Sequence, residues 1–180
     1  MPQYIRFVPN ILSTVRLILA CMFPFVPEHL WMWLIIGSGG SDVLDGWVAR
    51  HWQVQSRSGA ILDAVADKLF ILIALLTVAG AGKFSLWWLP LLLARDLLVA
   101  FTAAYAASIK SWESFNEMDV RWSGKLATAG QFLLLLVAVL FPAGIWFALW
   151  LAILFSVVAA ADYGRLFILE LRRRAEGKMH

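Results

Sequence analysis

Four aspartates lie close together within a very apolar part of the sequence: Asp42, Asp45, Asp63 and Asp67. Ionisable residues are rare in apolar membrane segments, and those that occur there have a functional role by default. Four converging carboxylates repel one another unless cations lie among them. Because oxygen ligands suit hard cations, the stretch indicates a site for Mg²⁺ or Mn²⁺. Two such ions can clamp a diphosphate and stabilise a leaving phosphate.

The spacing places the first two aspartates on one helix face. Asp42, Asp45, Gly46 and Ala49 follow the positions i, i+3, i+4 and i+7, which share one side of an α-helix. The small residues Gly46 and Ala49 would let a ligand approach the backbone closely. Arg50 follows directly and supplies positive charge beside this face.

A second helix face carries the other two aspartates. Gly59, Asp63 and Asp67 recur every four residues, which again places them on one side of a helix. Only the short polar stretch 51–58, with Arg57, separates the two faces. Helices joined by so short a connection are antiparallel neighbours, so the two pairs of carboxylates are expected to converge.

The composition is that of a membrane protein. Of the 180 residues, 62% are hydrophobic and 15% are charged, and the mean hydropathy is +0.78. Soluble domains are about half apolar and about a quarter charged. We expect a single membrane domain over residues 1–180. The single cysteine excludes an intrachain disulfide, and the formal charge of +3 gives no indication of nucleic-acid binding.

Six apolar segments predict an all-α, polytopic membrane protein with six transmembrane helices. Each is near the roughly 20 residues that a helix needs to cross a bilayer. Residues 1–9 are expected either to lie at the interface as an amphipathic segment or to be disordered. The six segments are 10–26, 30–50, 59–81, 85–109, 124–141 and 145–169.

The charges between these segments alternate in a way that predicts the topology. Loops on the cytoplasmic side are enriched in Lys and Arg, and this places both termini in the cytoplasm and the four aspartates at the cytoplasmic edge. All ten tryptophans fall near the ends of segments, as interfacial belts require. One side carries Arg6, Arg16, Arg50, His51, Arg57, Lys110, Arg121, Lys125, Arg165 and Arg172 to Arg174, and the other only Glu28, His29 and Lys83.

The stretch 42–67 resembles the signature of the CDP-alcohol phosphatidyltransferase family, D-x2-D-G-x2-A-R-x8-G-x3-D-x3-D. All eight specified positions and every gap agree. The resemblance extends to Pro9–Arg16, to Ser123–Gln131 and to Asp162-Tyr163, which are similar to segments of members that make phosphatidylglycerophosphate or cardiolipin. It therefore covers most of the chain.

Two positions depart from the pattern of those members. No proline follows Asp63, and Arg95-Asp96 resembles the cardiolipin-synthase-like members, where members that use glycerol 3-phosphate more often have Arg-Glu. These departures leave two acceptors open. One is glycerol 3-phosphate, which would give phosphatidylglycerophosphate, and the other is phosphatidylglycerol, which would give cardiolipin.

The resemblance implies an enzyme, a transferase that moves a phosphatidyl group from CDP-diacylglycerol to an alcohol and releases CMP. It implies two Mg²⁺ or Mn²⁺ ions on Asp42, Asp45 and Asp63, with Asp67 near them as the general base. It also implies a homodimer in a bacterial inner or plasma membrane, with the site facing the cytoplasm. The residues that would bind the CDP and diphosphate are Asp42, Gly46, Ala49, Arg50 and Gly59.

An acceptor such as glycerol 3-phosphate carries its own phosphate and needs cationic partners. The candidates are Arg16, Arg95, Arg121 and Lys125, with Lys125 as the first choice. Arg16 has an alternative role as a snorkelling arginine. Arg95 has an alternative role in an internal ion pair with Asp96 or with another helix.

A cation transporter is the alternative from a different functional class. It would use the aspartates as an ion site, with ionisable groups distributed along a path across the bilayer. Here the four aspartates cluster at one predicted membrane depth, which favours the transferase.

Overall fold

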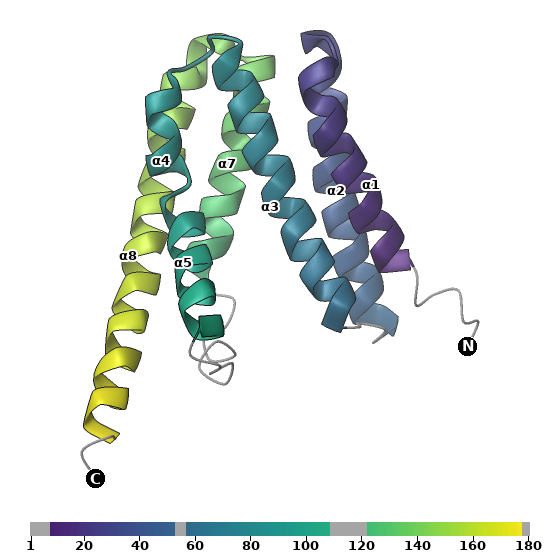
Figure 1. The fold of residues 1–180 in the computed structure, drawn as a ribbon. Helices are drawn as coiled ribbons and strands as arrows, with labels where there is room; N and C mark the ends of the chain where they lie inside the picture. The colour runs from purple at the N-terminus through teal and green to yellow at the C-terminus, as the bar shows by residue number, and fades with distance from the viewer. Residues whose placement is uncertain (1–7, 53–56, 109–121, 178–180) are drawn as a thin grey trace. The chain divides into compact units, whose positions relative to one another are not determined.

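The computed structural model describes residues 8–52, 57–108 and 122–177, with side chains described for 11–41, 62–105 and 122–172. All regular secondary structure in the described residues is helical, which confirms the predicted all-α class (Figure 1). The predicted interfacial segment falls mostly outside these residues, since the first helix begins at Val8. The helices are α1 (Val8–Met22), α2 (Glu28–Trp52), α3 (Arg57–Gly80), α4 (Leu89–Leu92), α5 (Ala94–Ser108), α7 (Trp122–Leu140) and α8 (Ile145–Gly177).

The chain divides into two compact units, which are described separately. The first contains Met1–Leu86 and Leu135–Ile145, and the second contains Trp87–Leu134 and Trp146–His180. In the first unit, α1 packs against both α2 and α3. Both the α2 and the α3 parts of the signature motif therefore belong to the first unit.

Aromatic packing holds part of the first unit together. Phe23 is fully buried, stacks on Trp31 with ring centroids 5.5 Å apart, and meets the edge of Phe70 at 5.8 Å. The Trp31 indole Nε1 donates to the Val26 carbonyl at 2.9 Å. Trp31 is thus a core residue of the first unit. Trp33 is 64% exposed and Trp87 is 87% exposed, and the predicted interfacial belts stay a prediction.

The end of α3 is fixed by glycine. Gly82 has a φ of 77°, a left-handed conformation that glycine adopts without steric cost. Its N–H donates to the Ala79 carbonyl at 2.9 Å, and the Lys83 N–H donates to the Val78 carbonyl at 3.3 Å. The chain then turns, and Lys83 forms an ion pair with Glu28 at 2.8 Å.

The segment predicted as one continuous fourth helix is instead broken. A short 3-10 turn (Leu86–Trp88) leads into α4, and the helix axis bends by 57° before α5. Leu93, at the bend, has φ −100° and ψ 8°, in the sparsely populated bridge region. Since Leu93 is neither glycine nor proline, the sequence at the bend itself gives no sign of it.

In the second unit, α7 and α8 pack closely at Gly130. A Cβ added there would lie 3.0 Å from Phe155 Cδ2 and 3.3 Å from Ala152 Cα. Among the described residues, two helices are long and apolar enough to cross a membrane, Trp122–Leu140 and Pro142–Arg172. The bent pair Leu86–Leu92 and Ala94–Tyr105 makes a third if it counts as one span. The six predicted spans thus correspond to helical segments, of which two or three meet this test.

Candidate active site

The structure places the motif on two helices joined by a short connection, as the spacing predicts. Because α2 is continuous to Trp52 and α3 begins at Arg57, the two helices are antiparallel neighbours in the first unit (Figure 1). The motif residues of α2, and Gly59 at the start of α3, have side-chain positions outside the described residues. In α2 these residues are Asp42, Asp45, Gly46, Ala49 and Arg50.

The two aspartates of α3 lie one turn apart on the same face. Asp63 and Asp67 are both partly buried, and Ala66 between them is fully buried. The Asp63 side chain is 37% exposed. Its Oδ1 accepts a bond from the Arg16 guanidinium at 2.9 Å and one from the Ser13 hydroxyl at 3.3 Å.

The pairing of Arg16 with Asp63 is the feature of this site that sequence reasoning missed. The Arg16 side chain is fully buried, so it does not snorkel. Besides its ion pair with Asp63, its Nε donates to the Ser41 hydroxyl at 3.4 Å, and Ser41 donates to the Ser38 carbonyl at 2.7 Å. One guanidinium therefore links α1, α2 and α3. A buried charge is stable only when it is paired and hydrogen-bonded, and Asp63 supplies that pair.

The chemistry of the donor set fits a hard divalent cation. Asp63 and Asp67 offer carboxylate oxygens from consecutive turns, and hydrogen bonds that orient a ligating carboxylate from behind are typical of metal sites. The further donors that the sequence predicts are Asp42 and Asp45, which lie within α2. Within the side chains that the structure describes, no group of three or more acidic, histidine or cysteine residues is found.

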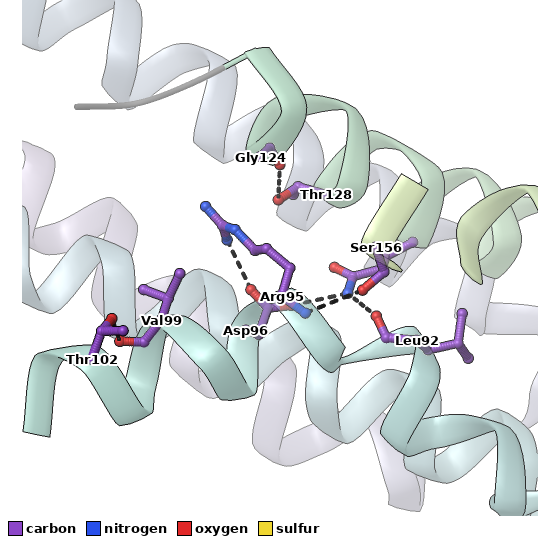
Figure 2. A network of polar contacts seen from close by, with 9 residues as sticks. Leu92, Arg95, Asp96, Val99, Thr102, Gly124, Thr128 and Ser156 are labelled. Atoms are coloured by element: carbon purple, nitrogen blue, oxygen red, sulfur yellow. Dashed lines mark hydrogen bonds and ion pairs between the residues drawn. The ribbon is translucent and has the colours of Figure 1, made fainter. Parts of the chain in front are cut away.

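A second polar cluster lies in the second unit, around Arg95. Its Nη1 forms an ion pair with Asp96 Oδ1 at 2.8 Å, with side chains only 14% and 15% exposed (Figure 2). The internal ion pair that the sequence left open is therefore present. The Arg95 guanidinium carbon also lies 5.3 Å from the centre of the Tyr163 ring, within the range of a cation–π contact.

The beginning of α7 approaches this guanidinium through a glycine. A Cβ built on Gly124 would lie 2.8 Å from Arg95 Nη2 and 2.9 Å from the Tyr163 hydroxyl oxygen. Next to it, the Ser123 hydroxyl donates to Asp162 Oδ2 at 2.8 Å. Three segments far apart in the sequence thus form one polar cluster, at Arg95-Asp96, Ser123-Gly124 and Asp162-Tyr163.

Lys125, a further acceptor candidate, lies near the same end of α7. Lys125 is exposed, and its Nζ lies 5.0 Å from the centre of the Trp122 ring. Arg121 falls outside the described residues. The predicted acceptor residues are therefore divided between the two units, with Arg16 in the first and Arg95 and Lys125 in the second.

The family follows from comparison with known proteins. The CDP-alcohol phosphatidyltransferase model matches residues 6–158, which include the motif and parts of both units. The chain belongs to the CDP-alcohol phosphatidyltransferase family. It is accordingly an enzyme that transfers a substituted phosphate group.

Individual relatives are similar over most of the chain. A Sodalis glossinidius protein is 32% identical over 155 residues, which are 83% of this chain and 82% of the relative. A Pectobacterium atrosepticum protein is 32% identical over 139 residues, 71% of this chain and 74% of the relative. A Yersinia enterocolitica protein is 34% identical over 119 residues, 63% of each chain. All three are named CDP-diacylglycerol–glycerol-3-phosphate 3-phosphatidyltransferase.

Proposed function

We propose that this enzyme transfers the phosphatidyl group of CDP-diacylglycerol to glycerol 3-phosphate, giving phosphatidylglycerophosphate and CMP. The choice of glycerol 3-phosphate as the acceptor rests on the 32% identity, over 83% of this chain, with a relative named for that reaction. The polar cluster around Arg95 supports it, because a guanidinium in a partly apolar setting binds phosphate well.

The four aspartates have separate roles in the proposed reaction. Asp42, Asp45 and Asp63, with Asp67 beside them, would hold two Mg²⁺ or Mn²⁺ ions, which supply charge neutralisation for the diphosphate. Asp67 accepts the proton of the acceptor hydroxyl. The hydroxyl oxygen bonds to the phosphorus of the phosphatidyl group, and the bond from that phosphorus to the CMP oxygen breaks. The general base must come within hydrogen-bond reach of the hydroxyl.

Arg16 fixes the direction of the Asp63 carboxylate. Its donors are directed to Asp63 at 2.9 Å and to Ser41 at 3.4 Å inside the first unit. Of its two predicted roles, neither snorkelling nor binding of the acceptor phosphate accounts for this pairing. We therefore assign the acceptor phosphate to Arg95 and Lys125, together with Arg121.

The nucleotide would lie against the motif faces of α2 and α3. Gly46, Ala49 and Gly59 leave room for the cytidine and diphosphate close to the backbone. Asp42 and Arg50 supply polar contacts to the same ligand. Both α2 and α3 are continuous helices through these positions. The residues of each set therefore share one face of their own helix.

The cardiolipin alternative rests on the pair Arg95-Asp96. Asp96 has a structural role, because its carboxylate accepts hydrogen bonds from Arg95 at 2.8 Å and from Gln131 at 3.0 Å. An aspartate at this position thus has a packing reason of its own. It does not by itself favour phosphatidylglycerol as the acceptor.

The membrane arrangement is also part of the proposal. Six spans, both termini in the cytoplasm and a site at the cytoplasmic edge of a bacterial inner membrane fit the helical segments and the alternating loop charges. With this arrangement the site would be open to cytoplasmic CMP and glycerol 3-phosphate, while the lipid tails remain in the bilayer. A homodimer, which the family resemblance implies, is also part of the proposal.

An acceptor panel tests the proposed function. Purified protein in detergent is given CDP-diacylglycerol, Mg²⁺ and one acceptor at a time: glycerol 3-phosphate, phosphatidylglycerol, inositol phosphate or serine. Mass spectrometry is expected to find phosphatidylglycerophosphate, formed in equal amount with CMP. Formation of cardiolipin, or of no lipid product with glycerol 3-phosphate, would refute the proposed acceptor.

A further inference from the structure

The break between α4 and α5 leaves backbone groups that the helix cannot pair. Such groups are costly in apolar surroundings and must find other partners. Gln131 of α7 donates from Nε2 to the Leu92 carbonyl at 2.8 Å, and Ser156 of α8 accepts a bond from the Arg95 N–H at 3.4 Å (Figure 2). Side chains from two other helices therefore pair backbone groups at the bend, directly beside the Arg95 side chain.

Gln131 makes a second bond that reaches the Arg95 side chain through Asp96. Its Nε2 also donates to Asp96 Oδ2 at 3.0 Å, while Asp96 Oδ1 accepts from Arg95 Nη1 at 2.8 Å. Both partners of Nε2 are acceptors, so a flipped amide would set oxygen against oxygen. Gln131 is fully buried, which fixes its amide in this orientation.

The contact between Arg95 and Asp96 depends on this support. Consecutive residues of a helix do not face each other, so the carboxylate must be held from outside α5 to meet the guanidinium. The remainder of the guanidinium is directed elsewhere, with Nη2 beside Gly124. Within the part of the chain that the structure describes, Arg95 Nε is buried without a hydrogen-bond partner. The described residues therefore leave one donor of this guanidinium, Nε, unsatisfied.

We propose that Gln131 and Asp96 are positioning residues, which hold the Arg95 guanidinium in the orientation that binds the acceptor's phosphate. The inference rests on the proposed function and deepens it. Neither residue touches the reacting atoms, so their replacement should weaken the use of a phosphate-bearing acceptor and leave the use of CDP-diacylglycerol intact. The helix break brings the Asp96 carboxylate within hydrogen-bonding distance of Gln131.

Gln131→Met tests this inference, because methionine matches the length of glutamine but cannot donate. We expect the KM for glycerol 3-phosphate to rise about tenfold, the change that follows from one lost hydrogen bond to a charged group. The KM for CDP-diacylglycerol and kcat should stay near wild type. Thr102→Val is the matched control, since Thr102 is buried and, among the described residues, its hydroxyl bonds within α5, to the Val99 carbonyl at 2.9 Å.

A double variant separates positioning from a general structural effect. If Gln131 acts through Arg95, Gln131→Met added to Arg95→Met should raise the KM for glycerol 3-phosphate no further. An additional tenfold rise in the double variant would refute the inference, as would an unchanged KM in Gln131→Met alone. Should Gln131→Met fail to fold, Asp96→Asn tests the same chain of contacts, since it keeps the shape and removes the charge.

The outcomes distinguish this inference from the proposed function. If the wild type makes phosphatidylglycerophosphate and Gln131→Met has a normal KM for glycerol 3-phosphate, only the inference fails. If the wild type instead uses phosphatidylglycerol, the proposed acceptor fails, and the same variants are compared on that anionic acceptor. A selective rise in its KM would support the positioning role, and equal KM values would refute it.

Discussion

Each unit of the molecule buries an arginine against an aspartate, but the two pairs are built differently. Arg16 reaches from α1 to Asp63 on α3 and is fully enclosed by protein. Arg95 pairs with its own neighbour in the sequence, and that pair is held by α7. The first arginine orients a motif carboxylate, that of Asp63. In the second, Nε has no hydrogen-bond partner among the described residues, and we assign this arginine to the acceptor phosphate.

The largest effect is expected at Asp67, the base beside the Arg16 pair. Asp67→Asn keeps the shape and removes the proton acceptor, so turnover should fall by about 10²–10⁴-fold. CMP release is the measurement. Glu28→Gln is the matched control, because Glu28 is 56% exposed and bonds to Lys83 away from the motif. A near-normal rate in Asp67→Asn would remove Asp67 from the role of base.

Arg16→Met should break the first pair and leave Asp63 without its counter-charge. Removing one partner of a buried ion pair costs about 3–5 kcal/mol, and the lower end applies here since Asp63 is partly exposed. The thermal midpoint of unfolding in detergent should therefore fall without metal and be partly restored by Mg²⁺. Arg16→Lys keeps the charge and should lose less. Equal midpoints for Arg16→Met and wild type would contradict the assigned role.

Gly124→Ala addresses the second pair. Its new Cβ would lie 2.8 Å from Arg95 Nη2, so the guanidinium must move. We expect the KM for glycerol 3-phosphate to rise about tenfold, as for a lost charged hydrogen bond, with the thermal midpoint nearly unchanged. Gly40→Ala is the control, because its Cβ would meet nothing within 4 Å. Equal kinetics in the two variants would separate Arg95 from the acceptor.

The smallest effect is expected at the exposed pair Glu28–Lys83. Its side chains are 56% and 28% exposed, and exposed ion pairs contribute about 0–1 kcal/mol. Lys83→Met should therefore lower the free energy of unfolding by less than Arg16→Met does, as measured by denaturant titration. A loss as large as that of Arg16→Met would show that burial does not decide the strength of these pairs.

The helices, and the division of the motif between two of them, could be predicted from the sequence. Apolar length sets the helices, and local signals such as the Gly80–Gly82 stretch and Pro142 mark their ends. The break at Leu93 could not be predicted, because the groups that stabilise it, Gln131 and Ser156, lie on other helices. The pairing of Arg16 with Asp63 was missed for the same reason, since it depends on how α1 packs against α3.

The most direct test of the central claim is CMP release from CDP-diacylglycerol by the purified enzyme, with Mg²⁺ and glycerol 3-phosphate each present or absent. The proposed chemistry predicts release only when both are present, loss of release on chelation with EDTA, and recovery when Mg²⁺ or Mn²⁺ is restored. Release that continues at the same rate without metal would contradict the role given to the four aspartates.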